Sequence, residues 1–318
     1  MNAKIEEIAK KLNKAKNIAV FCHVRPDGDA LGGGLALYLA LKNAGKNVVF
    51  ACEDDVPAKF FFIPAMSEVK REIPDLDYDL LVSVDCADIA RMGIFAKRFL
   101  KFKETVNIDH HISNSRFAKY NYVIDCPASC EILTEIFKTA KFEVTPQIAD
   151  ALMLGLITDS GNFVHMDVTE KTFQTAAFLR GKGADCTKIH YEMFSRQPKS
   201  RALLYGKVMS AMRFALDDKL AFVVVSAKDL EDAGADKSLT EGFVDFPLTI
   251  DGVEVSIALM EAKKDQYKVS LRSKGKVNVN EVAGEFGGGG HVLASGCMLS
   301  GSLEHVIDKL TYSIYRNL

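Results

Sequence analysis

In the first half of the chain, short apolar segments alternate with longer segments of helical character. Four of the short segments are rich in strand-forming residues and bounded by polar ones: 17–22, 47–52, 79–84 and 105–108. The helical segments lie between and after them, at 31–44, 91–100, 128–140, 146–159 and 169–181. This alternation predicts an α/β fold with a parallel sheet that is covered on both faces.

The pattern changes after about residue 184. A single amphipathic helix is expected at 199–212, and strands separated by polar turns follow at 220–225, 253–259 and 267–271. A chain of 318 residues is long enough for two domains, each with its own core. We therefore expect a parallel-sheet domain at 1–185, a helical connector at 186–213 and a smaller α+β domain at 214–318.

Charge and cysteine content indicate what kind of partner the protein binds and in which compartment it is found. The chain has 40 basic and 42 acidic residues, whereas proteins that bind long nucleic acid usually have a basic excess. A small anionic substrate is thus favoured over a long duplex. The N-terminus reads as an amphipathic helix with charges throughout, and no segment is as long as a membrane span. Seven cysteines without a CxxC pair indicate reduced thiols, so we expect a cytoplasmic protein that binds no membrane.

Acidic residues and histidines gather where the predicted strands end. Such residues follow the first, third and fourth strands, and another aspartate ends the apolar helix at 146–159. Ligands of open parallel sheets bind outside the carboxyl ends of the strands, so these side chains are expected to converge on one crevice. The set comprises His23, Asp27, Asp29, Asp85, Asp109, His110, His111 and Asp159.

Several carboxylates close together raise one another's pKa, and a divalent cation relieves that repulsion. Oxygen ligands with some imidazole suit Mn2+ or Mg2+ better than a closed structural zinc site. The set is large enough for two ions about 3.5–4 Å apart that share a carboxylate and activate water for attack on a phosphate. Considered alone, Asp85 is interpreted as a turn residue, and Asp29 is interpreted as the cap of a helix. The metal site is indicated by the whole set.

Four segments resemble, in order and spacing, the motifs of the DHH phosphoesterase family: HVRPDGDALGG (23–33), VSVDCAD (82–88), NIDHHISN (107–114) and GLITDSGNF (155–163). The glycine-rich segment 287–296 resembles a motif of the DHH-associated C-terminal domain. The resemblance covers essentially the whole chain. It implies a DHH catalytic domain followed by a substrate-binding domain, as in the short family members of the nanoRNase and pAp phosphatase group.

The resemblance also implies roles for individual residues. It assigns four ligands to one metal ion, namely His23, Asp27, Asp85 and Asp159. It assigns four to the other, namely Asp29, Asp85, His110 and Asp159, so that Asp85 and also Asp159 are shared. Asp109 is expected to orient an imidazole, and His111 to contact the scissile phosphate or the leaving group. Mn2+ is the favoured ion with Mg2+ as the alternative, and a homodimer is expected by resemblance only.

Two features of the second half suggest a substrate clamp. Consecutive glycines leave backbone N–H groups unobstructed, so an anion-binding nest is expected at Gly288, Gly289, Gly290 and His291. Arg272 ends a predicted strand, where its guanidinium is able to grip a terminal phosphate. A flexible loop and a solvated strand-end arginine are the structural alternatives.

Three functions follow from these patterns and from the resemblance. The first is hydrolysis of short oligoribonucleotides (nanoRNA), or of the 3′-phosphate of pAp, or of both. The second is a phosphodiesterase acting on cyclic di-AMP or on its linear product pApA. The third belongs to another class, a nucleotide-binding module with an inactive metal site. The complete set of candidate ligands favours an enzyme.

Overall fold

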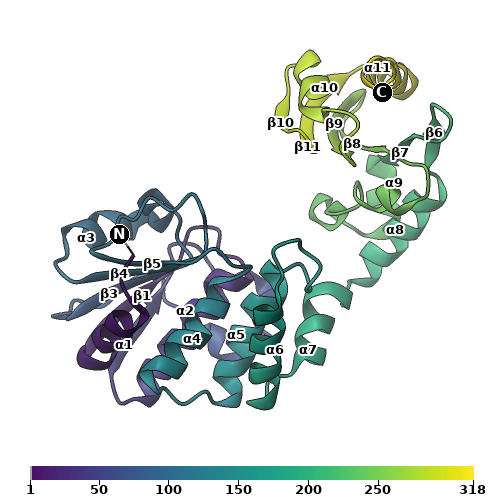
Figure 1. Ribbon diagram of the computed structural model, residues 1–318. Helices are drawn as coiled ribbons and strands as arrows, with labels where there is room; N and C mark the ends of the chain where they lie inside the picture. The colour runs from purple at the N-terminus through teal and green to yellow at the C-terminus, as the bar shows by residue number, and fades with distance from the viewer. Residues whose placement is uncertain (1) are drawn as a thin grey trace. The chain divides into compact units, whose positions relative to one another are not determined.

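The computed structural model describes residues 2–318 and divides the chain into two compact units, Met1–Arg196 and Gln197–Leu318 (Figure 1). The segment predicted as a connector, 186–213, supplies α7 (Cys186–His190) and η4 (Tyr191–Ser195) to the first unit and α8 (Lys199–Ser210) to the second. Its assignment as a separate element stays a prediction. Across residues 2–318, no helix combines the length and the apolar character that crossing a membrane requires.

The first unit contains a five-stranded sheet in which all neighbouring strands are parallel. The strand order is β2-β1-β3-β4-β5, and the strands are β1 (Asn17–Phe21), β2 (Asn47–Ala51), β3 (Leu80–Val84), β4 (Thr105–Asp109) and β5 (Tyr120–Val123). The predicted α/β class and the first four strands are confirmed, whereas β5 was not foreseen. Because β2 and β3 lie on opposite sides of β1, the winding changes direction there, and such a point is where open sheets bind ligands.

Alternating side chains of the strands supply two cores, one on each face of this sheet. Ile18 and Val20 of β1 pack against helices on one face, whereas Ala19 and Phe21 pack on the other face. The helices of the first face are α1 (Ile5–Lys14), α2 (Gly28–Asn43), α4 (Ser129–Ala140), α5 (Pro146–Asp159) and α6 (Glu170–Gly181). The second face is covered by η3 (Ile89–Phe95) and α3 (Ala96–Lys101). The prediction that both faces are covered is confirmed.

The segment 91–100, predicted as one helix, is broken at Gly93. This residue has φ 56° and ψ −130°, which is not helical, and the chain forms the 3₁₀ segment η3 before the short helix α3. The break brings the chain across Glu53, whose carboxylate accepts the N–H of Ile94 at 2.7 Å. A tertiary hydrogen bond thus outweighs the local helical pattern. Further 3₁₀ segments are η1 (Ala58–Phe60), η2 (Pro64–Glu68), η5 (Lys237–Thr240) and η6 (Phe246–Thr249).

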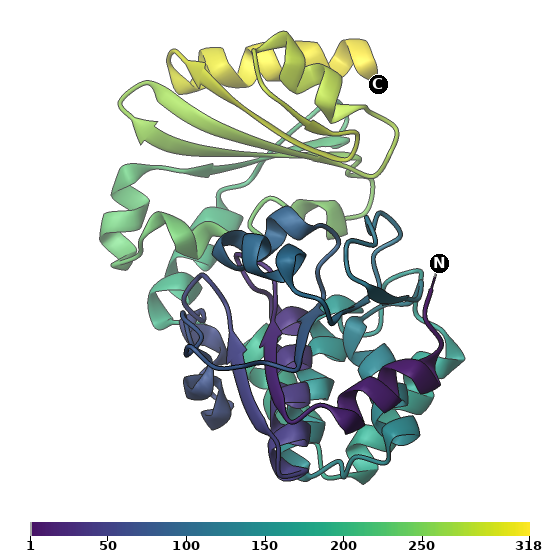
Figure 2. The same cartoon turned by 90° about the vertical axis from the view of Figure 1, so that its left-hand side faces the viewer.

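The second unit is built on a six-stranded mixed sheet of order β10-β11-β9-β8-β7-β6. Its strands are β6 (Arg213–Ala215), β7 (Leu220–Val225), β8 (Val255–Lys263), β9 (Gln266–Ser273), β10 (Gly289–His291) and β11 (Ala294–Ser300). Figure 2 shows α11 (Leu303–Asn317), in yellow, lying across one face, where α10 (Val279–Glu285) also packs. Part of the other face is covered by α8 and α9 (Ala227–Ala233). The predicted α+β character is confirmed, but β11 and α11 were not foreseen.

Candidate active site

The end of β1 places His23 and Asp27 at the carboxyl edge of the first sheet. His23 is buried, and its Nε2 lies 3.4 Å from Oδ2 of Asp27 and 3.5 Å from Oδ2 of Asp85. The other oxygen of Asp27, Oδ1, accepts the N–H of Ala30 at 3.1 Å and so caps α2. The same carboxylate therefore stabilises the start of a helix and faces the candidate site.

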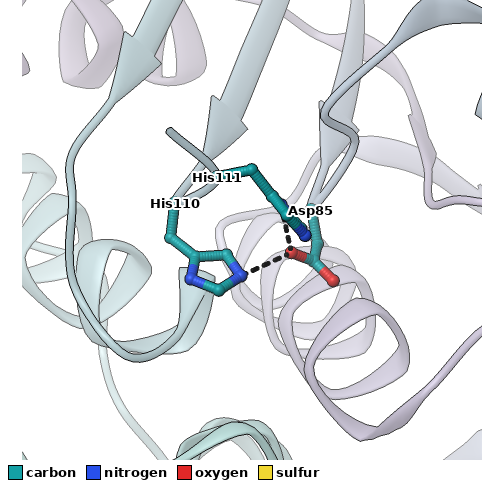
Figure 3. A group of neighbouring side chains, drawn as sticks. All are labelled: Asp85, His110 and His111. Atoms are coloured by element: carbon teal, nitrogen blue, oxygen red, sulfur yellow. Dashed lines mark ion pairs between the residues drawn. The ribbon is translucent and has the colours of Figure 1, made fainter. Parts of the chain in front are cut away.

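Asp85 follows β3 in a left-handed conformation with φ 59°, which is uncommon for a residue with a side chain. Its N–H donates to the carbonyl of Ile108 at 2.9 Å, which ties it to β4. Its Oδ1 lies 3.4 Å from Nε2 of His110 and 3.7 Å from Nδ1 of His111. Dashed lines in Figure 3 mark these two contacts. Since Oδ2 faces His23, the two oxygens of this buried carboxylate are directed to two different groups of candidate ligands.

Asp29 is completely buried at the start of α2, where it interacts with the beginning of α4. Its two oxygens accept the backbone N–H groups of Ser129 at 2.6 Å and Cys130 at 3.0 Å. The N-cap residue of α4, Ala128, makes no side-chain cap, so the oxygens of Asp29 pair N–H groups that the start of a helix leaves without an intrahelical partner. On its other side, Asp29 shares a cluster with His110 and Asp159, whose ligand atoms lie within 4.8 Å of one another.

Asp109 lies behind the histidines and holds one of them. Its Oδ1 lies 2.8 Å from Nδ1 of His111, and its Oδ2 accepts a hydrogen bond from Nδ2 of Asn114 at 2.5 Å. Burial raises the pKa of Asp109, but these two hydrogen bonds outweigh it and lower the pKa below its ordinary value. Its hydrogen bond in turn raises the pKa of His111. The ionised carboxylate fixes the orientation of the His111 ring.

The pKa shifts of the clustered carboxyl groups indicate that the cluster needs a positive charge. Burial, followed by the charges of Asp85 and Asp159, raises the pKa of Asp29 well above its ordinary value. Burial also raises the pKa of Asp159 to about 6, although His110 opposes the shift. Without a compensating cation these carboxyl groups therefore resist ionisation. Oxygen donors with imidazoles fit divalent cations such as Mn2+ and Mg2+.

Among residues 2–318, three groups of side chains each have ligand atoms that lie within 4.8 Å of one another. They are His23, Asp27 and Asp85; Asp29, His110 and Asp159; and Asp85, His110 and His111. Seven of the eight residues singled out in the first half of the sequence belong to these groups, and the eighth, Asp109, is hydrogen-bonded to His111. The first two groups have no member in common, and Asp85 faces both. The set fits two cations, which when bound would neutralise phosphate oxygens and lower the pKa of water.

The residues predicted to clamp the substrate lie in the second unit. His291 of β10 pairs with Ala294 of β11, and Ala294 pairs with Arg272 of β9. Residues directly opposite each other on neighbouring strands share a face, so His291 and Arg272 lie on the same face, two strand spacings or about 10 Å apart. The Nε of Arg272 lies 3.0 Å from Oδ1 of Asp245. The structure thus brings the two predicted anion-binding side chains to one row of the sheet.

Two N–H groups of the expected nest, those of Gly288 and Gly290, are hydrogen-bonded within the second unit. The N–H of Gly287 donates to Gly284, that of Gly288 to Ala283, and that of Gly290 to the side chain of Asn280. Gly288 and Gly290 serve close packing. A Cβ at Gly290 would lie 2.6 Å from the carbonyl oxygen of Ala294, and one at Gly288 would overlap the carbonyl of Gly296. The glycines allow the hairpin of β10 and β11 to close, which presents His291 at its exposed end.

Three residues near the metal-site candidates were missed from the sequence. Asn114 holds Asp109, Ser129 donates through Oγ to Oδ1 of Asp85 at 3.1 Å, and Arg91 lies beside His23. Asn114 belongs to the segment NIDHHISN, so its place after the histidines was a usable signal. Ser129 and Arg91 act through contacts with distant residues, which no local pattern encodes.

Family models agree with the fold and the site. The model described as "DHH family, N-terminal domain" matches residues 17–156, and the "DHHA1 domain" model matches residues 217–315. The chain therefore belongs to the DHH family, and it is a metal-dependent phosphoesterase of that family. The predicted family and enzyme class are confirmed.

Individual proteins of related sequence or fold are similar to this chain over most of its length. The chain is 32% identical over 306 residues to the bifunctional oligoribonuclease and PAP phosphatase NrnA of Thermus thermophilus, covering 95% of this chain and 90% of that protein. It is 23% identical to the cyclic-di-AMP phosphodiesterase GdpP of Bacillus subtilis, covering 95% of this chain and 48% of that protein. An exopolyphosphatase-related protein of Bacteroides fragilis has the same fold, with TM-score 0.80, 25% identity and coverage of 98% and 95% of the two chains.

Proposed function

We propose that this phosphoesterase hydrolyses short oligoribonucleotides and removes the 3′-phosphate of pAp. The observation that carries the proposal is the position of Asp85, whose two oxygens face two separate groups of candidate metal ligands. The NrnA protein of Thermus thermophilus, with both activities in its name, is similar over nearly the full length of both chains. The cyclic-di-AMP phosphodiesterase is less similar and about twice as long, so that alternative is not favoured.

The proposed roles of the residues follow the two ligand groups. One cation is held by His23, Asp27, Asp85 and Asp159, and the other by Asp29, Asp85, His110 and Asp159. Mn2+ is the proposed ion and Mg2+ the alternative; an exonuclease RecJ of the same fold, with TM-score 0.52 and 14% identity, has been crystallised with manganese. His111, oriented by Asp109, contacts the scissile phosphate or the leaving group. An inactive nucleotide-binding module is disfavoured because no candidate ligand is missing.

The proposed clamp consists of Arg272 and His291, which bind a phosphate remote from the one that is cleaved. They share a face of the second sheet, and Arg272 has a half-buried side chain whose partner, Asp245, is exposed and free to yield to a phosphate. Binding energy from a remote phosphate accelerates cleavage only when the substrate carries that phosphate. We further propose a cytoplasmic enzyme that acts as a homodimer and binds neither long duplexes nor membranes.

The first test is hydrolysis of a small panel in Mn2+: pAp, a dinucleotide, a five-residue RNA, pApA and cyclic di-AMP. Controls are an EDTA-treated sample and the Asp85→Ala variant. Turnover of pAp and the short RNAs that is lost in both controls is the expected result. A preference for cyclic di-AMP would reject the proposed substrate class while leaving the enzyme class intact.

The clamp is tested with Arg272→Ala and His291→Ala. Both variants are expected to hydrolyse pAp and pApA, which each carry a second phosphate, at least tenfold more slowly in kcat/KM. Both should hydrolyse bis-p-nitrophenyl phosphate, which has no second phosphate, at the wild-type rate. Arg213→Ala is the matched control, since Arg213 is an exposed arginine of β6 paired with Glu304. Equal loss with both kinds of substrate would disprove the clamp.

A further inference from the structure

Arg91 lies beside the candidate metal site without a role in the functions described so far. It is half-buried in η3, and its Nη2 lies 2.9 Å from Nδ1 of His23. Its carbonyl oxygen accepts the N–H of Val24 at 2.7 Å, which joins this segment to the residue after His23. A fixed positive charge is therefore held next to one of the proposed metal ligands.

The contact between Arg91 and His23 does not satisfy the guanidinium. The Nδ1 atom of His23 also lies 2.8 Å from the carbonyl oxygen of Val24, which only accepts hydrogen bonds. The Nε2 atom faces Asp27 and Asp85, so Nε2 is the atom available to a metal and Nδ1 is the one that bears hydrogen and donates to Val24. A nitrogen that donates has no lone pair left for Arg91. Over residues 2–318, the nitrogen of His23 is the one side-chain atom within hydrogen-bond distance of the Arg91 guanidinium.

The backbone around Arg91 is fixed on both sides. Asp88 accepts the N–H of Ala90 at 2.8 Å through its side chain and the N–H of Arg91 at 3.1 Å through its carbonyl. On the other side, Glu53 accepts the N–H of Ile94. The bend between them needs Gly93, whose φ is 56° and at which a Cβ would overlap the Glu53 carboxylate. A half-buried cation that is held in place without an acceptor is prepared for an anionic ligand.

We propose that Arg91 binds a non-bridging oxygen of the phosphate that is hydrolysed. The inference rests on the proposed function, in that it requires the phosphate to lie at the first-unit cluster. A guanidinium offers several N–H donors in a planar fork, and its hydrogen bonds to phosphate are charge-assisted. The same positive charge repels a cation held by His23. Arg91 should therefore strengthen the binding of substrate and slightly weaken the binding of metal. If Arg91 acted only by supporting His23, its loss would weaken metal binding instead, so the two roles predict opposite changes in metal affinity.

The experiment compares Arg91→Met and Arg91→Lys with Lys97→Met, which removes an exposed charge from the neighbouring helix α3. Mn2+ affinity is measured by the electron paramagnetic resonance signal of free Mn2+, and kcat/KM is measured with pAp and a dinucleotide. Arg91→Met should lower kcat/KM by about 10- to 100-fold, as expected for loss of a charge-assisted hydrogen bond. It should bind Mn2+ as tightly as the wild type or more tightly. Arg91→Lys should recover part of the rate, and Lys97→Met should match the wild type.

Two outcomes would overturn the inference. One is a wild-type kcat/KM in Arg91→Met. The other is a loss of Mn2+ affinity that parallels the loss of rate, because Arg91 would then act by supporting His23. If the wild type hydrolyses none of the substrates, the proposed function fails, and the inference is decided by binding of inorganic phosphate to the Mn2+-loaded protein. Weaker phosphate binding by Arg91→Met than by Lys97→Met would support it, and equal binding would refute it.

Discussion

Gly155 of α5 lies so close to Asp29 of α2 that a Cβ at Gly155 would be 2.5 Å from Oδ1 of that carboxylate. The same Cβ would overlap the Sγ of Cys130. The Asp29 side chain is unable to move away, because it is completely buried and both of its oxygens accept hydrogen bonds from the start of α4. The closeness of two helices thus fixes the position of a proposed metal ligand.

Replacement of Gly155 by alanine should therefore harm both folding and metal binding. We expect Gly155→Ala to lower the free energy of unfolding by about 1–3 kcal/mol, the usual cost of overpacking a core, and to weaken Mn2+ binding by displacing Asp29. Urea unfolding in EDTA measures the first effect and Mn2+ titration the second. Gly181→Ala is the control, since no atom of residues 2–318 outside the local chain lies within 4 Å of a Cβ there. Wild-type stability and affinity in Gly155→Ala would contradict the packing argument.

The two functions of Asp27 are separable. Asn and Asp are equally good helix caps, whereas alanine is a poor one. Both Asp27→Asn and Asp27→Ala should lose Mn2+ affinity because both lose the charge that faces His23. Only alanine also loses the hydrogen bond to Ala30, so Asp27→Ala should be less stable than Asp27→Asn by about 1 kcal/mol. Thermal unfolding in EDTA tests this difference, and equal stability of the variants would show that the cap contributes nothing.

Metal binding should release protons from the histidines of the site. Burial lowers the pKa of His23, but its hydrogen bonds to Asp27 and Asp85 outweigh burial and raise the pKa to about 10. Burial also lowers the pKa of His110, but the charges of Asp29 and Asp85 outweigh burial and raise the pKa to about 9. Both imidazoles are therefore protonated at pH 7 in the metal-free protein. A metal ion binds only the neutral imidazole, so Mn2+ affinity should increase as the pH rises from 7 toward 9.

The stability of the metal-free protein should change in the opposite direction. A histidine whose pKa is raised by folding stabilises the protein fully below its unfolded pKa of about 6.5, and this contribution is lost as the pH rises through the folded pKa. Unfolding in EDTA should thus become easier between pH 7 and 10.

Calorimetric titration of Mn2+ at pH 7 in buffers of different ionisation enthalpy counts the protons that metal binding releases. Binding without proton release would contradict the assignment of His23 and His110 as ligands.

The sequence allowed the fold and the location of the site to be predicted because both depend on local patterns. Short apolar runs that end in acidic residues define strands and their carboxyl ends, and parallel pairing then brings those ends together. The orientation of each side chain was not predictable in this way. Asp85 adopts a left-handed conformation and directs its two oxygens to different groups of side chains, and Asp29 is held by residues 100 positions away.

The missed and mistaken elements have the same origin. The helix expected at 91–100 is broken because Glu53, which is distant in the sequence, binds the backbone at Ile94. The glycines before His291 were interpreted as a nest, and in the structure Asn280 accepts the N–H of Gly290 and the carbonyl of Ala283 accepts that of Gly288. Local composition shows that a segment is able to bend or bind, and tertiary contacts determine which of the two occurs.

Asp109 should affect the rate of the reaction through His111 alone. Its pKa is lowered, so it is ionised at neutral pH and accepts a hydrogen bond from Nδ1 of His111. Asp109→Asn replaces this charge with an amide and loosens the ring, and loss of such an orienting partner typically costs 10- to 100-fold in activity. We expect kcat for pAp to fall by about that factor while Mn2+ affinity changes little. The control Asp125→Asn makes the same change at an exposed position. A loss of Mn2+ affinity as large as the loss of kcat would instead make Asp109 part of the metal site.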